Sequence, residues 1–243
     1  RVITQALDRG VNYFDTAPAY AQSQDYYGEA LGPRRKDIFL ASKTHERSRA
    51  GALALLENSL SRLRTDHLDL WQLHDLRTVE DLDAIFGKGG AIEAVEQAKR
   101  EKLIRFAGVT GHYDPHILVE AIRRYPFDTV LSALNAADRH YLSFMEILLP
   151  EAVRRNMGII AMKVLARGAI MREGGVKSAR EAISYVLSLP VSTALIGCST
   201  PEEVAENAES VKNFSELADA VMKEMEALTK SYAWEATTFK AWP

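Results

Sequence analysis

Short apolar or β-branched runs alternate with longer amphipathic stretches along the whole chain. The predicted strands cover residues 11–17, 38–43, 68–74, 105–111, 129–135, 158–164 and 193–198. Predicted helices lie between them at 50–63, 91–101, 115–124, 144–155, 179–187 and 201–211, and a further helix ends near residue 10, before the first strand. Because parallel strands need long crossover connections, this alternation indicates a parallel sheet covered by helices.

The number of strands favours a (β/α)8 barrel, the TIM-barrel architecture. Seven strands are predicted, and a closed barrel of this class has eight. The chain opens on Arg1 in a helix that would normally follow a strand, so we expect the first strand to lie upstream of residue 1. An open, doubly wound parallel sheet is the alternative. A length of 243 residues suits one domain of this kind, so we expect a single barrel domain over 1–243.

Composition excludes several classes of partner and site. The formal net charge is −3, which gives no basic surface for nucleic acid or an anionic membrane. The single cysteine, Cys198, rules out an internal disulfide framework and multi-cysteine metal sites, and we expect no metal. No apolar stretch approaches the roughly 18 residues of a membrane span, and no signal peptide opens the chain. We expect a cytoplasmic protein, with an exported form still open because of the N-terminus.

Polar side chains stand at the carboxyl ends of the first three predicted strands. Asp15 ends the first strand, Tyr20 lies in the loop just after it, Lys43 ends the second strand and His74 ends the third. Each residue alone has a structural explanation, such as a turn cap, a packed ring or a solvated strand end. Together they place an acid, a phenol, an amine and an imidazole at consecutive strand ends, where a barrel directs side chains toward one cavity.

These four groups suit the reduction of a carbonyl. A phenol is protonated at neutral pH and can donate a proton, while a nearby cation favours its ionised form. Lys43 can supply that cation, Asp15 can hold Lys43, and His74 can donate a hydrogen bond to a substrate oxygen. None of the four side chains can transfer a hydride, so a hydride donor from outside the protein is required.

The motifs around these residues resemble those of the aldo-keto reductase superfamily. The resemblance extends along essentially the whole chain and rests on GVNYFDTAPAY, FLASKTH, SLSRLRTDHLDLWQLHD, REKLIRFAGVTGH, GIIAMKVLARG and ALIGCSTPEEVAEN. It implies a (β/α)8 barrel that reduces a small-molecule carbonyl substrate with NADPH and binds the nucleotide without a Rossmann fold. It also implies that Tyr20 is the general acid, that Lys43 and Asp15 tune it, and that His74 orients the carbonyl for hydride from C4 of the nicotinamide.

At the nicotinamide end, the resemblance implies contacts from four residues on later strands. Thr110 keeps the hydroxyl of the Ser-Asn pair usual in this family, whereas Gly111 lacks the amide, and His112 is a candidate replacement. Ser132 stands where the family often has a glutamine. Met162 stands where a tyrosine usually stacks on the nicotinamide, and a thioether replaces that contact only in part.

For the rest of the nucleotide, the resemblance implies contacts from Lys163, Leu165, Gly197, Ser199, Thr200, Glu203, Glu206 and Asn207. Ser199 and Thr200 precede a helix whose N-terminus suits phosphate, and Glu206 and Asn207 match the adenine-contacting pair. Glu203, however, occupies the place of an arginine that binds the 2′-phosphate in many members, and a carboxylate there repels phosphate. NADP(H) remains the cofactor that the resemblance implies, and Glu203 leaves NAD(H) as an open alternative. Lys163 and Arg167 either replace that arginine as cations for the 2′-phosphate or are ordinary solvent-facing charges.

We predict an NAD(P)H-dependent reductase of small or medium aldehydes and ketones. The oligomeric state and the physiological substrate are open. A Schiff-base lyase that uses Lys43, and a regulatory barrel that binds nucleotide with little turnover, are the alternatives. Two further features are ambiguous: Cys198 fits a small buried residue near the nucleotide loop, and the tail aromatics Tyr232, Trp234, Phe239 and Trp242 fit either a substrate pocket or packing outside the barrel.

Overall fold

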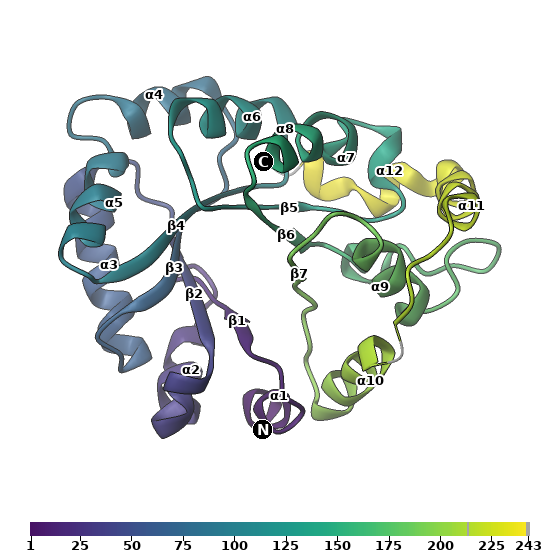
Figure 1. Ribbon diagram of the computed structural model, residues 1–243, viewed down its shortest axis with the longest axis horizontal. Coiled ribbons are helices and arrows are strands. Elements are labelled where there is room, and N and C mark those ends of the chain that lie inside the picture. Colours follow the sequence, from purple (N-terminus) through teal and green to yellow (C-terminus); the bar gives the residue numbers. More distant parts are fainter. Residues whose placement is uncertain (213, 242–243) are drawn as a thin grey trace.

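Seven parallel strands form one sheet whose neighbours follow the order of the sequence. The computed structural model describes residues 1–212 and 214–241. The strands are β1 (Tyr13–Asp15), β2 (Phe39–Thr44), β3 (Leu68–Leu73), β4 (Ile104–Gly111), β5 (Thr129–Ala133), β6 (Gly158–Met162) and β7 (Thr193–Ala194). Figure 1 shows that the sheet curls, so that β1 and β7 turn toward each other across an open barrel. A doubly wound sheet reverses its strand order, so this order confirms the barrel. The eighth strand of the expected barrel is not among the described residues.

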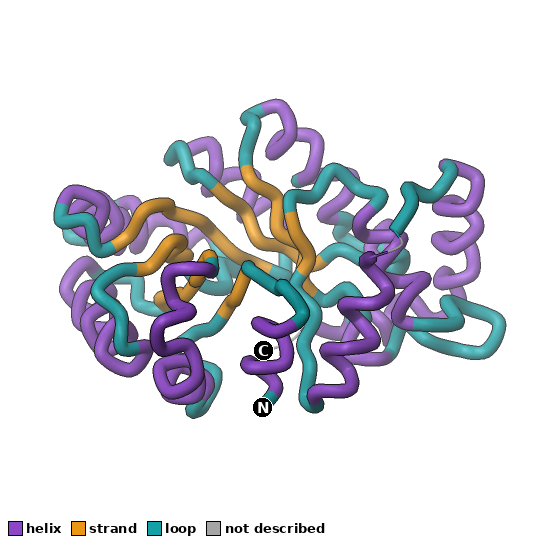
Figure 2. Tube along the Cα trace, turned by 60° about the horizontal axis from the view of Figure 1, so that its bottom comes forward, coloured by secondary structure: helices purple, strands orange, loops and turns teal. Residues whose placement is uncertain are grey.

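Helices cover the outside of this curled sheet, as Figure 2 shows. They are α1 (Val2–Asp8), α2 (Ser23–Leu31), α3 (Arg49–Leu63), α4 (Val79–Phe86), α5 (Ala91–Arg100), α6 (Pro115–Arg124), α7 (Phe144–Ile147), α8 (Leu149–Arg154), α9 (Ala179–Leu187), α10 (Pro201–Lys212), α11 (Asp219–Thr229) and α12 (Ala233–Ala236). None of the helices described is both long and apolar enough to cross a membrane.

Two of these helices begin with a capped proline turn. The Asp114 carboxylate accepts a hydrogen bond from the backbone amide of His116 at 2.9 Å, and Pro115 is the first residue of α6. At α10, the Thr200 hydroxyl accepts a bond from the amide of Glu203 at 3.2 Å, ahead of Pro201. A capping side chain followed by proline therefore gave correct helix starts.

Several predicted element boundaries differ from the structure. The helix predicted at 144–155 is divided into α7 and α8, because Pro150 has no amide hydrogen with which to continue the helical bonds. The last strand, predicted at 193–198, pairs only over Thr193–Ala194. Helices α2, α4, α11 and α12 were not predicted from the sequence.

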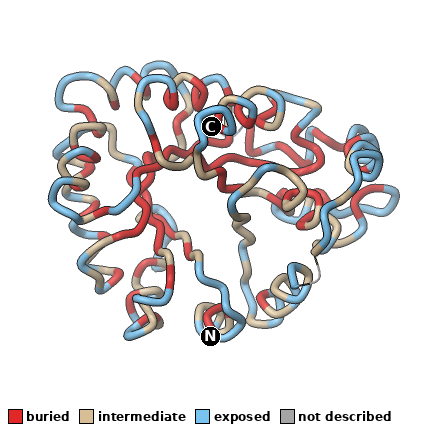
Figure 3. The backbone as a smooth tube through the Cα atoms, in the orientation of Figure 1, coloured by how far each residue is buried: buried red, intermediate tan, exposed pale blue. Residues whose placement is uncertain are grey.

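Two apolar layers hold the barrel together. Inside it, Ala41, Leu70, Leu131 and Ile160 pack against one another, one from each of four strands. The second layer lies between the sheet and the helices and is much larger; the buried strands and inward helix faces are red in Figure 3. Alternate residues of each strand face these two layers, which decides which side chains reach the barrel interior.

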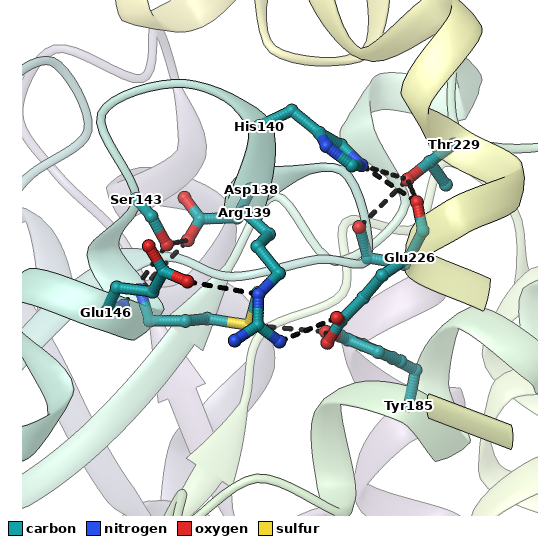
Figure 4. A network of polar contacts seen from close by, with 10 residues as sticks. Asp138, Arg139, His140, Ser143, Glu146, Tyr185, Glu226 and Thr229 are labelled. Atoms are coloured by element: carbon teal, nitrogen blue, oxygen red, sulfur yellow. Dashed lines mark hydrogen bonds and ion pairs between the residues drawn. The ribbon is translucent and has the colours of Figure 1, made fainter. Parts of the chain in front are cut away.

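The segment after α10 is fastened to the loop that follows β5. Glu226 of α11 accepts bonds from the Arg139 guanidinium (2.6 Å) and the Tyr185 hydroxyl (2.8 Å), as Figure 4 shows. His140 lies 2.8 Å from the Glu226 carbonyl, and the Thr229 hydroxyl donates to the Ala136 carbonyl at 2.9 Å. This network brings the C-terminal helices to the carboxyl end of the sheet.

Candidate active site

The four predicted site residues come together at the carboxyl ends of β1, β2 and β3. Asp15 ends β1, Lys43 lies in β2, His74 directly follows β3, and Tyr20 lies in the turn before α2. Lys43 is 1% exposed, and its ammonium donates to Asp15 Oδ1 and to the Thr16 carbonyl (2.9 Å). Buried charges are stable only when paired, so this ion pair fixes the ammonium inside the barrel mouth.

Tyr20 lies between the ammonium and the imidazole. Its ring centroid is 4.9 Å from Lys43 Nζ and 5.8 Å from the His74 ring, which meets it edge to face. The pKa of Tyr20 is raised, because desolvation outweighs the opposing effect of Lys43. Lys43 thus favours the phenolate as expected, but the net shift keeps the phenol protonated at neutral pH.

The surroundings of His74 favour its neutral form. Burial, and then the positive charge of Lys43, lower the pKa of His74 to about 3. A neutral imidazole carries one N–H donor and one acceptor, so His74 can donate to an oxygen without bringing a charge.

The backbone of His74 is held by an arginine that was not predicted. Arg47 donates to the carbonyls of His74 (2.9 Å) and Asp75 (3.1 Å), and its Nε donates to Asp81 at 2.8 Å. Asp75 has a φ of +55°, an uncommon conformation for a residue with a Cβ. Arg47 therefore fixes the turn that directs His74 toward Tyr20.

Asp75 and His112 form a second polar pair beside the first four residues. The Asp75 carboxylate accepts from Arg77 Nε at 2.8 Å, and its other oxygen lies 3.3 Å from His112 Nδ1. Burial is the main cause of a lowered pKa at His112. The ring of the tail residue Phe239 meets His112 at 6.2 Å, edge to face. The motif LHD was the only sequence signal for Asp75.

The nicotinamide-end residues lie on both faces of the sheet. Thr110 shares the inner face, and its Oγ1 is 3.4 Å from the Asp75 amide. Met162 packs against the inner apolar layer. Gly111 faces outward, because a Cβ there would meet Leu118 of α6 at 3.1 Å.

Ser132 is also directed away from the barrel interior. Its neighbour Leu131 belongs to the inner layer and Val130 to the outer one, so alternation places Ser132 with Val130. The Ser132 hydroxyl is fully buried and has no hydrogen-bond partner among the described residues. The structure therefore does not bring Ser132 together with Lys43 and Tyr20, and Leu131 holds the inward position on β5.

Beyond β6, the chain makes irregular turns near the site. Lys163 has a φ of +57°, and its carbonyl accepts from Asn135 Nδ2 at 3.1 Å. Burial, followed by the Arg167 charge, lowers the pKa of Lys163. Leu165 packs against the outer apolar layer. Arg167 is exposed, so of the two candidate cations only Lys163 is partly covered.

The residues predicted for the phosphate and adenine lie at the start of α10. Gly197 has open space around it, with no atom within 4 Å of where a Cβ would stand. Ser199 and Thr200 are exposed, but the Ser199 amide donates to Glu203 Oε2 at 2.6 Å. The carboxylate of Glu203 therefore already neutralises the partial positive charge of this helix start.

In the same region, Asn207 Nδ2 of α10 donates to Cys198 Sγ at 3.3 Å, while Glu206 is exposed. Burial raises the pKa of the Cys198 thiol, in keeping with a packed and unreactive side chain. Within the part of the chain described, no cluster of side chains suits a metal ion.

The tail aromatics have different surroundings. Tyr232 and Phe239 are buried, and Tyr232 donates to the Ile170 carbonyl at 3.0 Å. Trp234 is 58% exposed and meets Tyr141 at 5.8 Å. Trp242 lies outside the described residues.

A family model described as the aldo/keto reductase family matches residues 1–173. The chain belongs to this family. This aldo/keto reductase is similar to L-galactose dehydrogenase of Arabidopsis thaliana, with 27% identity over 96% of the chain and 85% of that protein. It is 25% identical to the uncharacterized oxidoreductase YqkF of Bacillus subtilis, over 97% and 89% of the two chains.

Among solved structures, it is similar to the holo form of the aldo-keto reductase AKR11C1 from Bacillus halodurans. The TM-score is 0.80 with 26% identity, over 94% of this chain and 86% of that one. Both the family and the fold agree with the sequence-based prediction. This aldo/keto reductase is an NAD(P)H-dependent oxidoreductase.

Proposed function

We propose that this chain reduces an aldehyde or ketone to an alcohol, with Tyr20 as the proton donor. The single observation that carries this is the position of the Tyr20 ring, 4.9 Å from the buried Lys43 ammonium and 5.8 Å from His74. The nicotinamide supplies a hydride from C4 to the carbonyl carbon. The proton that balances it goes from the Tyr20 hydroxyl to the carbonyl oxygen.

The other residues make that proton transfer easier. A neutral His74 donates a hydrogen bond to the carbonyl oxygen and orients it. Lys43 stabilises the phenolate that remains after Tyr20 loses its proton, and Asp15 holds Lys43 in place.

The buried ion pair argues against a Schiff-base lyase. An amine that forms an imine must first lose its charge, whereas Lys43 donates to a carboxylate and a carbonyl within a buried site. These contacts stabilise the ammonium.

For the nucleotide, we infer that NADH is used at least as well as NADPH. The Glu203 carboxylate accepts from the Ser199 amide at the start of α10. A 2′-phosphate at this helix start would meet a negative charge and a backbone donor already engaged. NADP(H), expected from the resemblance, remains the alternative.

The proposal is tested by following NADH and NADPH oxidation with a panel of activated aldehydes, glyceraldehyde and aldoses. Tyr20→Phe should lose turnover by about a hundredfold or more and keep cofactor binding, since proton transfer contributes about 10²–10⁴-fold. Tyr26→Phe is the matched control: this tyrosine is 56% exposed on α2 and donates to Gln22 at 2.7 Å.

Cofactor binding without turnover in the unmodified protein would favour the regulatory alternative. An active Tyr20→Phe variant would remove Tyr20 as the acid.

A further inference from the structure

A buried glutamine lies beside the proposed catalytic residues. Gln72 is on β3, paired in register with Lys43 of β2, and its side chain has no solvent exposure. Its Nε2 donates to Asp15 Oδ2 at 3.1 Å, while Asp15 Oδ1 receives the Lys43 ammonium. Each carboxylate oxygen of Asp15 is therefore held from a different strand.

The side-chain oxygen of Gln72, unlike its nitrogen, makes no hydrogen bond to a described residue. Gln72 Oε1 is buried and has no hydrogen-bond partner within the described chain. Burying such an oxygen without a partner is unfavourable. Neighbouring inward positions such as Leu70 and Leu131 are apolar, so an apolar side chain also suits this layer. The hydrogen bond from Gln72 Nε2 to Asp15 offsets that cost.

The next strand leaves room for this side chain. Gly108 of β4 pairs with Gln72, and a Cβ at residue 108 would lie 3.0 Å from Gln72 Cγ and 2.3 Å from Thr129 Oγ1. Both distances are closer than ordinary packing allows. The glycine therefore permits Gln72 to extend toward β1.

We propose that Gln72 is a positioning residue for the proposed reduction and acts through Asp15. By holding Oδ2, it fixes the rotation of the Asp15 carboxylate so that Oδ1 faces Lys43. The Lys43 ammonium then stays beside the Tyr20 ring. This inference rests on the proposed function, because it assigns Gln72 to the same proton transfer.

The test compares Gln72→Met with Gln24→Met. Gln24 is an equally buried glutamine whose Nε2 donates to Ser42 Oγ at 2.9 Å and whose Oε1 also has no described partner. We expect Gln72→Met to lower kcat about tenfold or more, because a hydrogen bond to a charged group is lost. The KM for the aldehyde and the Kd for NADH should stay within about twofold. Gln24→Met should leave kcat unchanged.

Gln72→Glu adds a readout that a packing role would not affect. The carboxylate introduced by this substitution faces Asp15 without a donor when it is ionised, whereas its protonated form has one O–H to donate. Relative to the unmodified protein, the activity of Gln72→Glu should therefore rise as the pH is lowered, and that of Gln72→Met should not.

A double-mutant cycle with Asp15→Asn identifies the route of the effect. If Gln72 acts through Asp15, Gln72→Met should change kcat little in the Asp15→Asn background. Equal losses in both backgrounds, equal losses in Gln72→Met and Gln24→Met, or full activity of Gln72→Met would overturn the proposal. Full activity of Asp15→Asn alone would instead contradict the proposed function.

Discussion

Lys240 Nζ lies 2.6 Å from Asp138 Oδ1, and both side chains are almost completely buried, with exposures of 0% and 1%. The ammonium also donates to the carbonyls of Tyr141 (2.6 Å) and Leu142 (3.1 Å). Asp138 Oδ2 accepts a hydrogen bond from Ser143 Oγ at 2.9 Å, in the left half of Figure 4. This ion pair joins the C-terminal segment to the loop after β5, one residue from Phe239 and its contact with His112.

Replacing Lys240 with methionine should destabilise the protein by about 3–5 kcal/mol, because Asp138 is left buried without its cation. The free energy of urea unfolding measures this. Adding Asp138→Asn should recover part of the loss, since no uncompensated charge then remains. Lys230→Met, at an exposed lysine of the same segment, is the control. A loss below about 1 kcal/mol would show that the pair contributes little.

Replacing Glu203 with arginine should shift cofactor preference toward NADPH. The substitution removes the carboxylate that accepts from the Ser199 amide and adds a cation at the start of α10. We expect the ratio of the Kd values for NADPH and NADH to change by about tenfold or more, measured by calorimetry without substrate. Glu202→Arg changes the same charge at the neighbouring exposed position and is the control. An equal shift in both variants would indicate only a general charge effect.

The location of the site could be predicted from the sequence because it depends on strand ends. Asp15, Lys43 and His74 end or follow runs that read clearly as buried strands, and parallel strands bring such ends to one edge. The face of the sheet on which a strand residue lies is harder to predict, since an error of one residue in the alternation places the side chain on the opposite face. Ser132 illustrates this, because Leu131 holds the inward position.

Apart from the expected contact between Asp15 and Lys43, contacts between side chains of different strands could not be predicted. The bond from Gln72 to Asp15 depends on strand register and on the rotamer of a residue that looks like an ordinary strand position. Asp75 depends on a backbone turn with positive φ. At Glu203, the sequence indicated a charge unfavourable to phosphate, but not that the same carboxylate caps its own helix.

His74 should make stability depend on pH below neutrality. Its pKa is about 3 in the folded protein against an unfolded reference of about 6.5, so the unfolded chain binds a proton that the folded chain does not. The folded state is therefore fully favoured above about pH 6.5, and this group disfavours it increasingly as the pH falls toward 3. Urea unfolding at pH 7 and pH 5 should differ by up to about 2 kcal/mol from His74 alone.

In His74→Gln this part of the pH dependence should disappear. A smaller dependence remains, because the pKa of His112 is lowered in the same direction. His116→Gln, at an imidazole whose side chain is 64% exposed, should keep the dependence of the unmodified protein. Identical slopes in His74→Gln and the unmodified protein would contradict a neutral, partly buried His74.

The raised pKa of Tyr20 predicts opposite pH dependences for the two directions of reaction. Reduction uses the protonated phenol, so its kcat/KM should be flat between about pH 6 and 9 and should fall only above about pH 10. Oxidation of the alcohol uses the phenolate, so its kcat/KM should rise with pH across the same range. Lys43→Met removes the cation that lowers the Tyr20 pKa, so less phenolate forms at pH 8. The kcat/KM for oxidation at this pH should therefore be lower than in the unmodified protein. If the kcat/KM for reduction by the unmodified protein already falls at pH 7–8, the acid is a group other than Tyr20.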